Sequence, residues 1–224
     1  MSGKLFVIEG LDGSGKQTQT SLMYEALVSE GYRVMKVEYP NYKSESSALV
    51  KMYLRGDFGS RPGDVDPYVS STFFAADRYA SFKTEYEDFY RSGGIVLADR
   101  YTTSNMVHQA SKITDPAEKI KYLDWLCDFE FRLYGIPRPE QVFFLDMEPE
   151  NSAMLIKERL NKFSHEAAKD IHESDREYLE DSYANALWVV ERYGWEHIRC
   201  TRNGVIKSIE EIHGILLERL KKYL

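Results

Sequence analysis

The chain has 224 residues, of which 43% are hydrophobic and 29% charged, the balance of an ordinary folded protein in water. Its formal net charge of −7 argues against broad electrostatic binding of nucleic acid, although a few converging cations can still hold a small anion. No apolar run approaches the roughly 20 residues of a membrane-spanning helix. We therefore expect a cytoplasmic protein that binds neither membrane nor nucleic acid. Its two cysteines, Cys127 and Cys200, match no metal or redox spacing and are predicted to be free, buried thiols.

Five short apolar segments alternate with helical stretches along the chain. The predicted strands are residues 5–9, 33–38, 95–98, 141–145 and 195–200. Helices are predicted at about 16–30, 44–55, 67–92, 103–111, 116–134, 150–162, 174–193 and 209–223. This alternation predicts an α/β fold, a five-stranded parallel sheet with helices on both faces. We find no repeat and no linker, so we expect a single domain over residues 1–224 with ligands beyond the carboxyl ends of the strands.

The first strand is followed by a glycine-rich loop that ends in a lysine, Gly10-Leu11-Asp12-Gly13-Ser14-Gly15-Lys16, which is the spacing of a P-loop. Backbone N–H groups in such a loop turn toward phosphate oxygens, and the helix that follows adds its positive end. Lys16 supplies a mobile cation. Because this lysine stands where a predicted strand passes into a predicted helix, the motif is not explained by a glycine turn that merely joins the two elements. The predicted ATP-binding residues are Gly10, Asp12, Gly13, Ser14, Gly15, Lys16, Gln17 and Thr18.

One position departs from the P-loop pattern, which has serine or threonine directly after the lysine to hold Mg²⁺. Here that position is Gln17. Its amide oxygen can ligate the metal, or water can take its place. A second metal ligand is predicted at Asp99, a carboxylate that directly follows the third strand and faces the P-loop, where it can hold Mg²⁺ or orient a nucleophilic oxygen. Arg100 comes next and can donate paired hydrogen bonds to a phosphate.

In their order and separation, these motifs resemble those of the thymidylate kinase family. The resemblance rests on residues 8–16, 74–78 and 99–101, on Ser104 and Gln109, and on 144–146, and it spans nearly the whole chain. It implies a three-layer P-loop kinase fold with a short lid. It also implies Mg²⁺-dependent transfer of the γ-phosphate of ATP to dTMP, giving dTDP and ADP. Because the family commonly forms dimers, a homodimer is expected.

The resemblance implies roles for single residues in the dTMP site. Asp12 contacts the 3′-hydroxyl of the sugar, Phe74 stacks on thymine, Arg78 bonds the base, and Arg100 binds the acceptor phosphate. A flat aromatic face suits any base, whereas an arginine can donate to thymine O4, which cytosine replaces with an amino group. Because neighbouring side chains on a helix diverge by about 100°, one ring of the pair Phe73-Phe74 is expected in the core.

Two further positions of the predicted dTMP site differ from the family pattern. Gln109 falls where a polar side chain approaches base and sugar, and its neighbour His108 replaces a family tyrosine. Many members carry an arginine beside the proline that is Pro40 here, so Tyr42 or Lys43 would have to replace it at the acceptor phosphate. The predicted dTMP-binding residues are Asp12, Tyr42, Phe74, Arg78, Arg100, Ser104 and Gln109.

A basic segment at about 157–176 falls where the family has its lid. The variable P-loop positions 11–14 contain no basic side chain, so a lid cation is expected to stabilise the transferring phosphoryl group. Arg159 or Lys162 is favoured for this role. The predicted catalytic residues are Lys16, Asp12, Arg100, Asp99, Arg159 and Lys162.

Two other functions fit parts of the sequence. A deoxynucleoside kinase phosphorylates the 5′-hydroxyl itself and needs a base after the second strand, where Glu38 stands. A P-loop protein that binds nucleotide without transferring phosphate, as a regulator, is favoured only by Gln17. An assay with dTMP and thymidine side by side separates the two kinases, and ATP turnover with added dTMP identifies the regulator.

Overall fold

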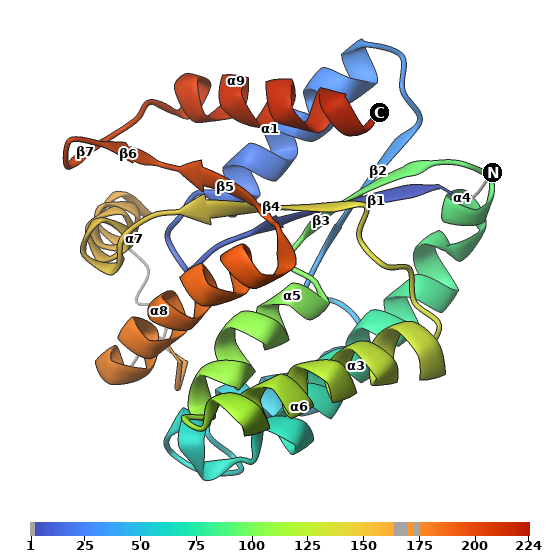
Figure 1. The fold of residues 1–224 in the computed structure, drawn as a ribbon. Helices are drawn as coiled ribbons and strands as arrows, with labels where there is room; N and C mark the ends of the chain where they lie inside the picture. The colour runs from blue at the N-terminus through green and yellow to red at the C-terminus, as the bar shows by residue number, and fades with distance from the viewer. Residues whose placement is uncertain (1–2, 164–169, 173–174) are drawn as a thin grey trace.

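The computed structural model describes residues 3–163, 170–172 and 175–224. A five-stranded sheet with the order β2-β3-β1-β4-β5 forms its centre (Figure 1). Its strands are β1 (Lys4–Glu9), β2 (Val34–Glu38), β3 (Ile95–Asp99), β4 (Gln141–Asp146) and β5 (Glu196–Arg199). All neighbouring strands are parallel, which confirms the predicted fold class. Each strand also lies within one residue of its predicted range at both ends.

The apolar strands build two cores, because successive side chains of a strand point to opposite faces of the sheet. In β1, Leu5 and Val7 pack into one core, while Phe6 and Ile8 pack into the other. Figure 1 shows the helices that cover the two faces. One face carries α1 (Lys16–Ser29) and α9 (Ile209–Leu220); the other carries α6 (Pro116–Cys127) and α8 (Arg176–Tyr193).

Further helices lie between the strands of the sheet in chain order. They are α2 (Ala48–Leu54), α3 (Pro67–Ser81), α4 (Glu87–Arg91), α5 (Thr102–Ser104) and α7 (Pro149–Phe163). Three of the long predicted helices contain a π-helical segment, at Phe82–Tyr86, Asn105–Gln109 and Asp128–Leu133. Such wider turns are frequent at functional sites, and the second of them carries the predicted residue Gln109.

A third, smaller apolar cluster lies away from the sheet, around α2. Its buried members are Val50, Tyr53, Leu54, Val65 and Ile171, and Phe73 and Phe74 pack against it. The backbone N–H of Ile171 donates to the carbonyl of Leu54 at 3.1 Å. The short stretch 170–172 between α7 and α8 is therefore attached to α2.

Three smaller observations complete the fold. Both cysteines are free, as predicted; Cys200 is buried, whereas Cys127 is only partly so. The antiparallel hairpin of β6 (Thr201–Arg202) and β7 (Val205–Ile206) follows β5 and was not predicted. Among the helices of the described residues, none has the length and apolar character needed to cross a membrane.

Candidate active site

A cleft of about 770 Å³ lies at the carboxyl ends of the parallel strands. This volume is typical of pockets that bind small molecules. Its walls contain the predicted residues Asp12, Gly13, Ser14, Gly15, Lys16, Gln17, Thr18, Tyr42, Phe74, Arg78, Asp99, Arg100, Ser104 and Gln109. Of the predicted residues whose side chains are described, only Gly10 is missing from the walls. The fold therefore brings segments from many parts of the chain to one place.

The P-loop is held against the start of α7 by a close backbone approach at Gly13. This residue has a φ of +80°, in the region that favours glycine, and a Cβ built on it would lie 2.6 Å from the carbonyl oxygen of Ser152. Any side chain would clash there and strain the backbone. The loop conformation thus depends on glycine for steric reasons, apart from any contact with phosphate.

Lys16 begins α1 and is 7% exposed. Its Nζ donates to the carbonyl oxygen of Leu11 at 2.7 Å and lies 3.9 Å from Oδ1 of Asp12. Burial and the nearby Arg100 lower the pKa of Lys16 to about 8, against the opposing effect of Asp12. The ammonium is therefore held inside the loop, in an environment that opposes its charge. Phosphate oxygens in the cleft would relieve that cost.

Arg100 is the centre of a charge network next to Lys16, since both cations lie against Oδ1 of Asp12. Its φ of +65° is uncommon for a residue with a side chain, and such strain is concentrated at functional sites. The guanidinium donates from Nη2 to Oδ1 of Asp12 and from Nη1 to Oγ of Ser104, the latter at 3.3 Å. Burial tends to raise the pKa of Asp12, but Arg100 and Lys16 hold it below the ordinary value. Asp12 is thus ionised and bound to Arg100.

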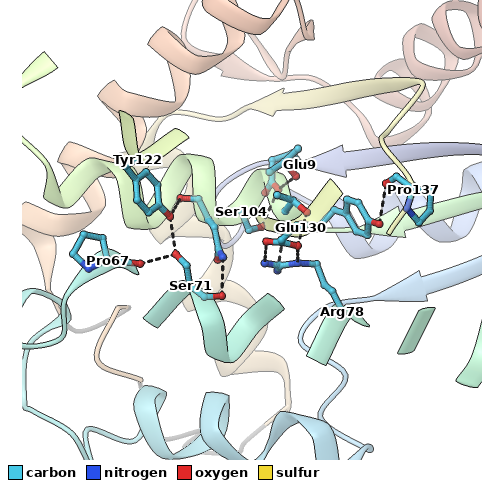
Figure 2. Close-up of polar contacts among 12 residues, drawn as sticks. Glu9, Pro67, Ser71, Arg78, Ser104, Tyr122, Glu130 and Pro137 are labelled. Carbon is cyan, nitrogen blue, oxygen red and sulfur yellow. Dashed lines mark hydrogen bonds and ion pairs between the residues drawn. The ribbon is translucent and has the colours of Figure 1, made fainter. Parts of the chain in front are cut away.

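Glu9 is a functional candidate that the sequence analysis quoted only as part of a motif. It ends β1 and is fully buried. Its carboxylate accepts from Oγ1 of Thr103 at 2.6 Å and from Oγ of Ser104 at 2.8 Å (Figure 2). Nη1 of Arg100 lies 3.5 Å from Oε1. Glu9 therefore anchors Arg100 and Ser104 to the end of the central strand. In the sequence, this role is indicated only by a single acidic residue at the end of an apolar run.

Two acids stand side by side where β2 and β3 end. Glu38 and Asp99 are register partners, and both line the cleft. Burial raises the pKa of Asp99, and Lys16 and Arg100 only partly offset this. The position expected for a metal-holding carboxylate therefore faces the P-loop, as the sequence suggested.

The P-loop pattern implies Mg²⁺, and the residues that line the cleft fit this ion. Gln17 and Asp99, whose side chains carry oxygen ligands, line the same cleft. Within the described residues, no group of three or more His, Cys, Asp or Glu side chains could hold a metal ion. This donor set fits Mg²⁺, because that ion keeps several waters and takes one or two carboxylates together with substrate phosphates.

The aromatic wall contains only one ring of the predicted pair. Phe74 lines the cleft, and Tyr53 meets it edge-on with centroids 6.0 Å apart. Phe73 instead packs between Tyr53 and Phe58, with centroid distances of 6.4 and 5.6 Å. The expectation that one ring would be in the core is met only in part, because both rings pack against the cluster around α2. Both phenylalanines are partly buried.

Arg78 lines the cleft and is also held in place by hydrogen bonds to Glu130 and Tyr101. It donates to the carboxylate of Glu130 from Nε at 2.7 Å and from Nη2 at 2.6 Å (Figure 2). Nη1 donates to the carbonyl of Tyr101 at 3.3 Å. These contacts use three of its five N–H donors. Glu130 is fully buried and was missed by the sequence analysis, because nothing near it in the sequence indicates a partner 52 residues away.

The π-helical segment after α5 brings two polar side chains into the cleft. Gln109 accepts from Oγ of Ser70 at 2.7 Å through its Oε1. Nε2 of His108 lies 3.3 Å from Nη1 of Arg100. Burial, together with Arg100 and His172, keeps the pKa of His108 far below its ordinary value. The ring is therefore neutral and accepts from the guanidinium.

The predicted catalytic cations of the lid lie outside the described side chains. The backbone at positions 159 and 162 belongs to α7, and nothing is described of the side chains of Arg159 and Lys162. Arg176 is described: it begins α8, is exposed, and pairs with Glu180 at 2.8 Å. The assignment of a lid cation stays a prediction.

The fold and the site together define the class of protein. A parallel sheet carries a P-loop after its first strand, and an acid-arginine pair follows the strand beside it. Both open into one nucleotide-sized cleft. This arrangement is that of a P-loop phosphotransferase.

Comparisons with known proteins narrow the class. A family model described as thymidylate kinase matches residues 8–202. A probable thymidylate kinase of Pyrobaculum aerophilum is 32% identical over 68% of this chain and 69% of its own. The thymidylate kinase of an Exiguobacterium species is 25% identical over 99% and 98%. The solved thymidylate kinase of Candida albicans shares the fold, with a TM-score of 0.71 at 19% identity over 99% and 92%. The chain belongs to the thymidylate kinase family.

Proposed function

We propose that this protein transfers the γ-phosphoryl group of ATP to the phosphate of dTMP, giving dTDP and ADP. One observation carries most of the proposal. The cleft has a buried lysine in a P-loop and a guanidinium from the neighbouring strand, and both lie against the same oxygen of Asp12. Two adjacent cationic groups from different segments suit two phosphorylated ligands that meet end to end. Family membership supports the same activity.

On the donor side, the P-loop backbone and Lys16 would hold the β- and γ-phosphates of ATP. Because burial opposes the charge on Lys16, phosphate oxygens that approach it restore a favourable environment. Gln17 and Asp99 would contribute oxygen ligands to Mg²⁺ on this side. When bound, that ion neutralises charge that develops on the phosphate oxygens.

On the acceptor side, Arg100 would donate to the phosphate of dTMP. It already lies at the cleft wall and is oriented by Asp12 and Ser104. Phe74 offers a flat face for the base, and Arg78 has N–H donors beyond those used by Glu130 and Tyr101. Asp12, Tyr42, Ser104 and Gln109 complete the proposed contacts around sugar and phosphate.

The test is a phosphate-acceptor assay with ATP, Mg²⁺ and either dTMP or thymidine. We expect turnover with dTMP and none with thymidine. Glu38 lines the cleft where a deoxynucleoside kinase would have its base, so turnover with thymidine alone would favour that activity. Binding of ATP with no turnover of either acceptor would favour a regulatory protein.

A homodimer is proposed from the family resemblance, and the cytoplasmic location expected from the sequence is kept as a proposal. Light scattering on the purified protein tests the dimer, with a mass of twice 26.0 kDa as the expected result. Fractionation of cells that express the tagged protein tests the location.

A further inference from the structure

Tyr53 lies directly behind the acceptor side of the cleft. It belongs to α2, is fully buried, and is not part of the cleft wall. Its ring supports the cleft-lining Phe74 edge-on at 6.0 Å and meets the ring of His172 at 5.3 Å. His172 itself lines the cleft. Tyr53 thus contacts two wall residues that come from different parts of the chain.

The hydroxyl of Tyr53 has a hydrogen-bond direction that its partners determine. Nζ of Lys112 lies 3.0 Å from it, and Nε2 of His172 lies 2.9 Å from it. Burial lowers the pKa of Lys112 to about 7. In its protonated form Lys112 only donates, so the hydroxyl oxygen then accepts from Lys112 and donates its own hydrogen to Nε2 of His172, which places the ring hydrogen on Nδ1.

The ionisation of His172 agrees with this direction. Burial and the charge of Lys112 lower the pKa of His172 to about 3. The imidazole is therefore neutral in the physiological range and can accept from a hydroxyl. It also faces His108 in a stacked arrangement, with centroids 6.1 Å apart and planes at 26°. His108 in turn accepts from Arg100.

The same ammonium reaches a second part of the wall. Lys112 donates to the carbonyl of Val65 at 3.2 Å and lies 3.5 Å from Oγ of Ser70. Ser70 donates to Gln109, which lines the cleft. Two series of contacts therefore run from Lys112 to the acceptor wall, one through Tyr53 and one through Ser70. The second series does not involve the P-loop, and the first reaches it only at Asp12, through His108 and Arg100.

We propose that Tyr53 is a positioning residue for the acceptor nucleotide: its hydroxyl fixes the orientation of His172, and its ring supports Phe74. The inference rests on the proposed function in that it takes this half of the cleft to be the dTMP site. A tyrosine that served only to fill the core would stabilise the protein through its ring, and loss of its hydroxyl would not distinguish one substrate from the other. Loss of a hydroxyl that positions the acceptor nucleotide would lower the affinity for dTMP and leave the affinity for ATP unchanged.

The experiment compares Tyr53→Phe with the wild type in full-length protein. Dissociation constants for dTMP and ATP are measured by calorimetry, and KM and kcat by steady-state assay. We expect Kd and KM for dTMP to rise about fivefold, the effect of one lost hydrogen bond. The Kd for ATP and the kcat at saturating dTMP should stay unchanged, because the ring and the P-loop are untouched.

Tyr223→Phe is the matched control. Its hydroxyl also accepts one hydrogen bond, from Gln141 at 2.9 Å, and donates another, to Glu196 at 2.8 Å, but it lies outside the cleft wall. This variant should bind dTMP like the wild type. An equal rise in the Kd for dTMP in both variants would overturn the proposal, as would an unchanged Kd in Tyr53→Phe.

His172→Phe keeps a ring at that position and removes the accepting nitrogen, so it tests the same contact from the other side. It should lower the affinity for dTMP as Tyr53→Phe does, and the double variant should bind dTMP no more weakly than either single variant. Additive losses would overturn the proposal, and His172→Phe decides alone if Tyr53→Phe does not fold. If the wild type neither binds nor phosphorylates dTMP, the proposed function fails and the inference falls with it. If the wild type is active and Tyr53→Phe behaves like it, only the inference fails.

Discussion

The donor and acceptor halves of the cleft are built in different ways. The proposed donor half consists largely of consecutive residues, 12–19, whose backbone and single lysine would form the phosphate cradle. The acceptor half is assembled from side chains far apart in sequence, such as Phe74, Arg100 and His172. The first depends on local backbone conformation and the second on long-range packing. Substitutions should therefore have local and separable effects in the donor half, and connected effects in the acceptor half.

The largest expected effect concerns the support behind the acceptor half. Glu130→Ala leaves the buried guanidinium of Arg78 without its partner, which should destabilise the fold by about 3–5 kcal/mol. Chemical denaturation measures this. The control is Asp128→Ala, which breaks the exposed pair with Arg132 on the same helical stretch and should change stability little. Similar losses in both variants would show that burial does not distinguish the two pairs.

The next effect concerns the donor half. Lys16→Ala removes the cation of the P-loop, and turnover should fall on the order of 10²-fold or more, as when an electrostatic contact to the transition state is lost. Lys36→Ala, at an exposed lysine on β2, is the control and should retain activity. Near-normal turnover in a folded Lys16→Ala protein would contradict the assignment of Lys16 to the ATP phosphates.

A pH profile of the unaltered protein examines the same lysine. Because the pKa of Lys16 is lowered from 10.5 to about 8, the free protein loses this charge as the pH rises through 8. Well above that pH, kcat/KM for ATP should fall about tenfold per pH unit. Between these two pKa values the unfolded chain binds more protons, so Lys16 makes the fold more stable as the pH rises. Deprotonation of Lys16 therefore cannot lower the activity by unfolding the protein. A flat profile of kcat/KM against pH would contradict the assignment of Lys16 to the ATP site.

The smallest expected effect concerns the departure at Gln17. The amide oxygen of Gln17 is expected to be a weaker Mg²⁺ ligand than a hydroxyl at that position. At limiting Mg²⁺, the turnover of Gln17→Ser should therefore lie between that of the wild type and about two- to threefold above it. The two proteins should converge at saturating Mg²⁺. Loss of activity at every Mg²⁺ concentration in a folded variant would give Gln17 a different role.

The same contrast explains how much the sequence could predict. Local patterns located the five strands and the P-loop, because apolar runs and glycine spacing are properties of neighbouring residues. The partner of Arg78 could not be found this way, since the sequence around Glu130 predicts only an ordinary helix and Glu130 meets Arg78 only through folding. The role of Tyr53 was hidden for the same reason.

One missed element did have a local signal. The β6–β7 hairpin turns at Asn203-Gly204, both with positive φ, of 50° and 77°. Asn-Gly between short strand-like segments is a strong hairpin signal. Each strand has only two residues, which is too short for an alternating apolar pattern to indicate a strand.

The most direct test of the two-part cleft is a set of calorimetric titrations of ATP and dTMP into wild type, Lys16→Ala and Phe74→Leu. Loss of a ring that stacks on a base should weaken dTMP by about 1–3 kcal/mol. The account predicts that Lys16→Ala weakens ATP and leaves dTMP nearly unchanged, and that Phe74→Leu does the reverse. If each substitution weakens both ligands alike, the two halves are not separate sites, and the account is contradicted.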